Sequence, residues 1–157
     1  MVFNRRRVLS GLVAGSAGML SLSPRAFATV KSSPKPPLLP EALAALQAHG
    51  SNILHRDVIG IADFSARSNE ARLHLVDVTG GRVIENYLVS HGRGSDPTNT
   101  GFVQRFSNRP GSNASSRGSY LTAETYYGKH GRSRRLRGLD PENNLALPRG
   151  IVIHSGA

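Results

Sequence analysis

The sequence predicts a mostly β domain with one short helix, and three observations support this fold class. Short aliphatic and β-branched runs recur along residues 57–157, separated by turns rich in Gly, Pro, Asn and Asp. Only the segment 41–49 has the Ala- and Leu-rich composition of a helix, and heptad repeats are absent. With 38% hydrophobic residues, 17 Gly and 9 Pro in 157 residues, we expect one domain with a modest core and many turns.

The first 28 residues are typical of an export signal. The basic head Arg5–Arg7 precedes a weakly apolar stretch, 8–22, and Ala26–Ala28 fits the small-x-small rule for signal cleavage. Arginines directly before apolar residues in a Gly/Ser-rich core favour the twin-arginine type over an ordinary secretory signal. We therefore expect cleavage near Ala28 and export to the periplasm or cell envelope. No stable membrane anchor is expected, because the apolar stretch is short and rich in Gly.

The charge balance is strongly basic, with a formal net charge of +10. Without the four arginines of the signal, 16 basic residues face 10 acidic ones, which leaves +6 and predicts an anionic partner. Between residues 105 and 137 the single acid is Glu124, against many Arg and Lys. This stretch fits a nucleic-acid stripe, a solvated face, or a surface for carboxylate-rich peptides, which Arg forks bind bidentately. Expected export favours the peptide surface and argues against nucleic acid.

Residues 29–56 are predicted to form a linker followed by the short helix. Four prolines between residues 29 and 40 are typical of a stiff, solvated segment. Pro40 before the Ala- and Leu-rich segment and Gly50 after it mark the ends of a helix over 41–49. The folded domain is then expected over residues 57–157.

The first half of this domain predicts three strands, over 58–62, 72–78 and 82–90. The turn 79–81 contains two glycines, which tolerate the positive φ that tight hairpins need, so the last two strands are expected to form a hairpin.

The second half alternates loops with short strands. The polar segment 91–117 is longer than most loops of compact domains, so we expect it to be functional or disordered. Further strands are predicted over 118–122, 134–139 and 151–154, with a turn at 128–131 and a loop at 139–144.

Three histidines, His91, His130 and His154, are candidates for chemistry because small neighbours leave their rings accessible. His154 is the strongest candidate, since it ends an aliphatic strand where a polar side chain needs a partner or a role. Ser155 is excluded as its nucleophile, because adjacent residues of a strand point to opposite faces.

A nucleophile for His154 is therefore sought elsewhere, and Ser112, Ser115 and Ser116 are the serine candidates. The 157 residues contain no Cys, which excludes a thiol nucleophile and thiolate metal sites within them. Three histidines also suit a zinc-dependent hydrolase, but no short metal-ligand spacing supports one. We expect no metal and no cofactor.

Several motifs in one order resemble a known family. They are Phe106–Ser112, Ser115–Thr122, Thr125–Gly131, Arg135–Leu139 and Ile151–His154, with His91-Gly92-Arg93 before them. Over residues 57–157 the sequence is similar to the murein L,D-transpeptidase catalytic-domain family, a branch of the YkuD-like enzymes.

This resemblance implies a β-sandwich of mixed sheets with a groove for peptidoglycan stem peptides. It also implies a Cys thiolate that attacks the carbonyl of diaminopimelate and expels the terminal D-Ala. The resulting thioester is passed to an amine of a neighbouring stem or to water. A His beside the Cys lowers the thiol pKa and so generates the thiolate.

By the resemblance, His154 corresponds to the catalytic His, and Ser155 to the small residue that helps to orient it. Gly118 and Tyr120 correspond to a structural strand motif. His91, His130 and Tyr120 are expected to bind substrate. Arg134 stands where this branch usually has an apolar residue.

The family's S-x-G-C segment, which carries the nucleophile, has no counterpart in these residues. We therefore expect a chain truncated before the Cys motif, with an incomplete sandwich, and inactive and unstable by itself. The alternatives are a non-catalytic peptidoglycan-binding module and the zinc-dependent hydrolase built on His91, His130 and His154. Peptidoglycan stem peptides are the expected partner, and the oligomeric state is left open.

Overall fold

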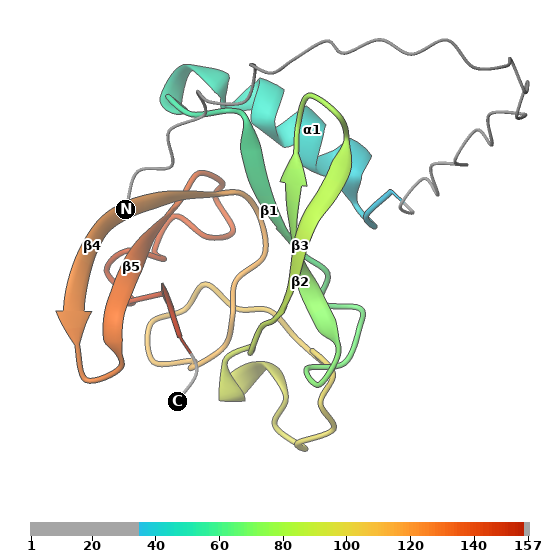
Figure 1. Ribbon diagram of the computed structural model, residues 1–157. Helices are drawn as coiled ribbons and strands as arrows, with labels where there is room; N and C mark the ends of the chain where they lie inside the picture. Colours follow the sequence, from blue (N-terminus) through green and yellow to red (C-terminus); the bar gives the residue numbers. More distant parts are fainter. Residues whose placement is uncertain (1–34, 156–157) are drawn as a thin grey trace, which may run out of the picture. The chain divides into compact units, whose positions relative to one another are not determined.

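The computed structural model describes residues 35–155 and confirms a mostly β fold with one α-helix (Figure 1). The expected export signal, residues 1–28, and the start of the linker lie outside the described residues. The elements are α1 (Leu39–Ala48), the 3-10 turn η1 (Gly50–Asn52), β1 (Val58–Ala62), β2 (Ala71–Asp77), β3 (Arg82–Leu88), the 3-10 turn η2 (Arg93–Ser95), β4 (Tyr120–Gly128), β5 (Gly131–Gly138) and β6 (Val152–His154).

Strands β1, β2 and β3 form an antiparallel sheet in sequence order. The predicted hairpin is β2–β3, and Gly81 in its turn has φ 59°, which glycine adopts without steric cost. Strand β1 has the predicted bounds, while β3 ends at Leu88 rather than at the predicted residue 90.

Helix α1 packs on this sheet and forms a small apolar core with it. Pro40 lies in the first helical turn, where its missing N–H costs nothing. Leu39, Ile61 and Val76 are buried together at the centre of the core. Burial of such side chains contributes about 1.5–3 kcal/mol each, so three of them give only a limited driving force.

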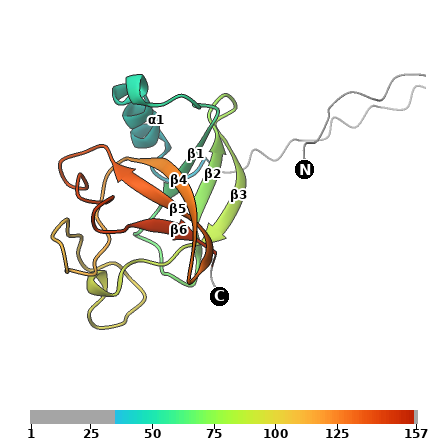
Figure 2. The same cartoon turned by 90° about the vertical axis from the view of Figure 1, so that its left-hand side faces the viewer.

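Strands β4, β5 and β6 form a second antiparallel sheet with β5 in the middle, and Figure 2 shows β6 beside β5. The β4–β5 hairpin is longer than predicted, because β4 continues to Gly128 and β5 already begins at Gly131. Strand β6 lies within the predicted range, yet Ile153 is 48% exposed, so it is not the buried strand that its sequence indicates. Every described strand pair is antiparallel, in contrast to the expected mixed sheets.

The long segments 89–119 and 139–151 are fixed largely by polar side chains rather than by apolar packing. Fully or nearly fully buried polar residues in the described part of the chain are Arg72, Ser95, Asp96, Ser116, Ser133 and Asn143. The segment predicted to be functional or disordered, 91–117, therefore has a defined hydrogen-bonded conformation. In residues 35–155 no helix has the length and apolar character needed to cross a membrane.

Candidate active site

His154 lies at the end of β6, where β6 pairs with the central strand β5. Its Cα partner on β5 is Ser133, which is buried, whereas His154 itself is exposed. The Nδ1 atom of His154 is 2.8 Å from the backbone carbonyl oxygen of Ser155. A carbonyl only accepts, so Nδ1 of the neutral ring carries the proton and Nε2 presents a free lone pair.

A second histidine fixes the plane of this ring. His130 lies in the β4–β5 turn, and its ring stacks on that of His154 with centroids 4.4 Å apart and an interplanar angle of 11°. The structure thus brings together two of the predicted site residues from different elements. Together the Ser155 carbonyl and the His130 ring restrain both the tautomer and the orientation of His154.

His91 lies in a different and more buried environment. Its side chain is 8% exposed, with Nδ1 2.8 Å from Nη2 of Arg72 and Nε2 3.7 Å from the Asp96 carboxylate. Because a guanidinium only donates, Nδ1 of His91 accepts and Nε2 carries the proton. His91 therefore contacts Arg72 and Asp96, and within residues 35–155 it forms no hydrogen bond with His130 or His154.

Arg72 is the buried anchor of this second cluster, and it is 1% exposed. Its guanidinium donates to the carbonyl oxygens of Val89 and Ala66 and stacks 4.9 Å from the centroid of the Phe64 ring. Strand β2 thereby holds the start of the long loop that follows β3.

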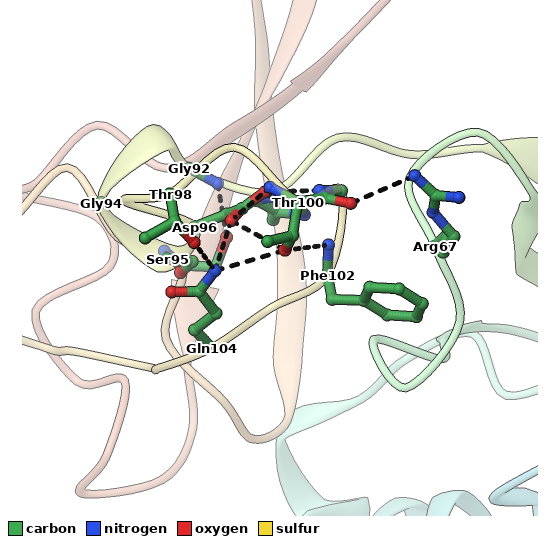
Figure 3. Close-up of polar contacts among 12 residues, drawn as sticks. Arg67, Gly92, Gly94, Ser95, Asp96, Thr98, Thr100, Phe102 and Gln104 are labelled. Carbon is green, nitrogen blue, oxygen red and sulfur yellow. Dashed lines mark hydrogen bonds and ion pairs between the residues drawn. The ribbon is translucent and has the colours of Figure 1, made fainter.

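Asp96 lies beside His91 on the side of Nε2, and Figure 3 shows its contacts with the following loop. Its carboxylate accepts hydrogen bonds from the backbone N–H groups of Thr100 and Gly101 and from the side chains of Thr100 and Gln104, at 2.7–3.0 Å. Burial alone would raise the pKa of the Asp96 carboxyl, but these hydrogen bonds outweigh it, so the pKa lies below its ordinary value. The ionised Asp96 carboxylate thus fixes the loop 96–104, because it accepts hydrogen bonds from N–H and O–H groups of that loop.

Tyr120 points into the protein. Its hydroxyl donates to the Ser116 carbonyl at 2.7 Å and lies 2.7 Å from the Ser116 hydroxyl, and burial raises the pKa of this phenol. Ser115 and Ser112, the other serine candidates, are bonded to Gly92 N–H and to Arg149. Within the described residues, none of these three serines forms a hydrogen bond with His154.

Two side chains that sequence analysis did not select organise the neighbouring loops. Arg149 donates through Nη1 to the Ser107 carbonyl (2.8 Å) and through Nη2 to the Ser112 hydroxyl (3.1 Å) and the Ala114 carbonyl. Asn143 is fully buried and donates to the Ser119 carbonyl at 2.8 Å. Neither lies in a periodic segment, so no sequence signal distinguishes them from ordinary loop residues.

A metal centre receives no support from this arrangement. Across residues 35–155 no three His, Cys, Asp or Glu side chains gather where they could hold a metal ion. His91 is engaged by Arg72 and Asp96, apart from the stacked pair, so the three histidines of the hydrolase alternative do not form one ligand set.

The arrangement suits proton transfer at an exposed edge. One imidazole has a fixed tautomer, a restrained plane and an Nε2 atom with no hydrogen-bond partner among residues 35–155, and these properties are what a general base requires. The sequence model of a family described as L,D-transpeptidase catalytic domain matches residues 31–157. Neither a curated protein nor a solved structure matches the chain significantly.

Proposed function

The chain belongs to the L,D-transpeptidase catalytic domain family, and we propose that His154 is the base of an acyl-transfer site for peptidoglycan stem peptides. The observation that carries this proposal is the double restraint on His154, through the Ser155 carbonyl and the His130 ring. Both restraints leave Nε2 free to take a proton from a thiol or to give it to a leaving amine.

The chemistry implied by the family needs a thiolate next to this base. The 157 residues contain no Cys, so acyl transfer needs a thiol that these residues do not supply. We propose that residues 1–157 alone bind stem peptides but form no thioester and release no D-Ala.

The test uses the purified 157-residue protein with peptidoglycan sacculi and with a soluble stem peptide that ends in D-Ala. Binding without D-Ala release is expected. Release of D-Ala would contradict the proposed inactivity, whereas failure to bind both sacculi and peptide would contradict the assignment to stem peptides.

A non-catalytic binding module is the second candidate, and the absence of Cys from these residues favours it. The acyl-transfer site and the binding module differ in whether the bound peptide lies next to His154. If His154 is the base of the site, its ring resonances shift in NMR spectra when the stem peptide is added. His74 is the matched control, because it lies in the other sheet, where its side chain contacts Asn86. The ring resonances of His74 should not shift. Binding with an unshifted His154 would favour the module.

We also propose that the protein is exported, with residues 1–28 as a cleaved, twin-arginine-type signal. The support is the basic head, the Gly-rich apolar stretch and the small residues before position 29. Cell fractionation and N-terminal sequencing of the mature protein provide the test. Replacement of Arg5, Arg6 and Arg7 by Lys should retain it in the cytoplasm, and unchanged export would indicate the ordinary secretory route.

A further inference from the structure

The turn that follows Phe106 forms a pocket that the proposed acyl transfer does not use. Residues 105–107 and 109–112 line it, and its volume is about 440 Å³. Arg149 fixes two residues of this lining, because its guanidinium donates hydrogen bonds to the Ser107 carbonyl and to the Ser112 hydroxyl. The turn is therefore fixed in shape although its tip is exposed.

The two hydroxyls of the pocket are committed as acceptors. The Ser107 hydroxyl accepts from the backbone N–H of Arg109 at 3.2 Å, and the Ser112 hydroxyl accepts from Arg149 at 3.1 Å. A hydroxyl that accepts from such donors keeps its own O–H to donate. Neither O–H has an acceptor recorded among the described residues, so both are available to a ligand.

The charged side chains of the pocket are also donors. Arg105 uses Nε to donate to the Gly94 carbonyl at 2.8 Å, which orients the guanidinium, and neither Nη group has a hydrogen-bond partner among residues 35–155. Neither Arg105 nor Arg109 forms an ion pair within the described part of the chain. Arg117 does not line the pocket, but its guanidinium lies 5.8 Å from the centroid of the Phe106 ring and adds a third positive charge beside this residue.

No carboxylate lines this pocket, so its polar side chains offer donors and positive charge without competing acceptors. We propose that the pocket binds a carboxylate group of an acidic peptide, which the proposed function identifies as a peptidoglycan stem peptide. The planar Arg109 guanidinium matches a carboxylate through two parallel hydrogen bonds, and the serine hydroxyls complete its shell. Phe106, which is 38% exposed, offers an apolar wall to the adjoining part of the peptide.

The experiment compares a soluble stem peptide that ends in D-Ala with the same peptide after its carboxylates are converted to amides. Binding of both to the 157-residue protein is measured by calorimetry at low salt. The acid form should bind about fivefold more tightly than the amide, because the amide lacks the negative charge that strengthens the hydrogen bonds from the Arg side chains.

Two variants locate the effect. Arg109→Gln should weaken binding of the acid peptide about fivefold, and Arg109→Lys should recover only part of the loss, because Lys lacks the fork. Arg82→Gln removes the same charge from an exposed position at the start of β3, outside the pocket and outside the basic stretch 105–137, and it should change the affinity less than twofold. Equal losses for Arg109→Gln and Arg82→Gln, or equal affinities for acid and amide peptides, would overturn the proposal.

Further arms separate this proposal from its competitors and from the proposed function. Inorganic phosphate that binds more tightly than the acid peptide, with the same dependence on Arg109, would replace the carboxylate by a phosphate ligand. An unrelated acidic dipeptide that binds through Arg109, while stem peptides and sacculi do not, would retain the pocket and refute the proposed function. Stem peptide that shifts the ring resonances of His154, with an affinity that Arg109→Gln leaves unchanged, would support the proposed function and refute the pocket.

Discussion

Gly118 is a position where both the backbone and the packing exclude a side chain. Its φ is 115°, and a Cβ atom there would lie 2.6 Å from Oδ2 of Asp140 and 2.9 Å from Nδ2 of Asn143. The Ser119 N–H, next in the chain, donates to Asp140. The glycine thus lets the start of β4 approach the polar turn after β5.

Gly118→Ala should therefore lower the free energy of unfolding by about 3 kcal/mol, through an unfavourable φ and a displaced Asp140. Gly131→Ala is the matched control, since Gly131 also has a positive φ (73°) but has open space around it. Its cost should be about 1 kcal/mol. Denaturant unfolding measures both, and similar losses for the two variants would mean that the packing around Gly118 contributes nothing.

Asp140 makes the stability depend on pH. Its carboxylate accepts from Ser119 N–H and lies 2.9 Å from Nε2 of His49 at the end of α1. Burial would raise the pKa of the Asp140 carboxyl, but the hydrogen bonds from Ser119 and His49 outweigh it and the pKa is lowered.

A pKa that is lower in the folded state contributes stability above the ordinary Asp value of about 4, and this contribution is lost as the pH falls through the folded-state pKa. The melting temperature should therefore fall as the pH is lowered below the ordinary Asp pKa of about 4. Asp140→Asn, which cannot ionise, should melt lower at pH 7 and should lose less on acidification than the unmodified protein. Parallel pH curves for the two proteins would show that Asp140 is not one of the groups responsible.

At the scale of the elements, the apolar core depends on few side chains. Val76 in the central strand β2 is fully buried against Leu39 of α1 and Ile61 of β1. This contact is the one place in the described chain where helix and sheet share a fully apolar interior.

Val76→Ala should lower the free energy of unfolding by about 2 kcal/mol, because it removes buried methyl groups and leaves a cavity. Val58→Ala on β1 deletes the same atoms from a residue that is 43% exposed, and it should cost less than about 0.5 kcal/mol. Chemical denaturation with unchanged m-values would give both numbers. A Val76 cost as small as that of Val58 would place the stabilising core elsewhere.

The elements that sequence predicts best are those whose pattern is local. Strand β1 follows from its short aliphatic run, and the β2–β3 turn follows from its paired glycines. The length of the β4–β5 hairpin exceeds the sequence prediction, because Tyr127 and Arg132 in its outer part are exposed. Backbone pairing rather than an apolar face extends the two strands there.

The candidate site was predictable only in part, for a related reason. His154 follows from its position after an aliphatic run, although its catalytic role stays a prediction. Its stack with His130 joins the β4–β5 turn to the end of β6, residues far apart in the sequence, and leaves no local signal. The burial of Arg72 was equally hidden, since an arginine in an alternating strand is usually solvated.

At the scale of the whole molecule, apolar side chains remain on the surface. Ile84 is 52% and Leu88 65% exposed on β3, an edge strand of its three-stranded sheet. An edge strand with exposed aliphatic residues is a template for pairing with another chain.

Ile84→Lys should therefore reduce self-association at high protein concentration and shift the free energy of unfolding by less than about 0.5 kcal/mol. Leu54→Lys makes the same change at a residue that is 92% exposed and outside any strand, so it should reduce association less. Sedimentation velocity across a concentration series distinguishes them. Equal effects would indicate general hydrophobic association rather than pairing along β3.

The polar interior of the loops has a thermodynamic consequence for the molecule as a whole. The heat capacity of unfolding rises with the apolar area exposed and falls with the polar area exposed. Because Arg72, Asp96 and Asn143 occupy buried positions and the apolar core is small, we expect unfolding to expose little apolar surface for a chain of this length. Scanning calorimetry should give a heat capacity change below the usual value of about 12–15 cal/mol/K per residue. The stability curve would then be shallow, and cooling the protein toward 0 °C would cost it little of its stability.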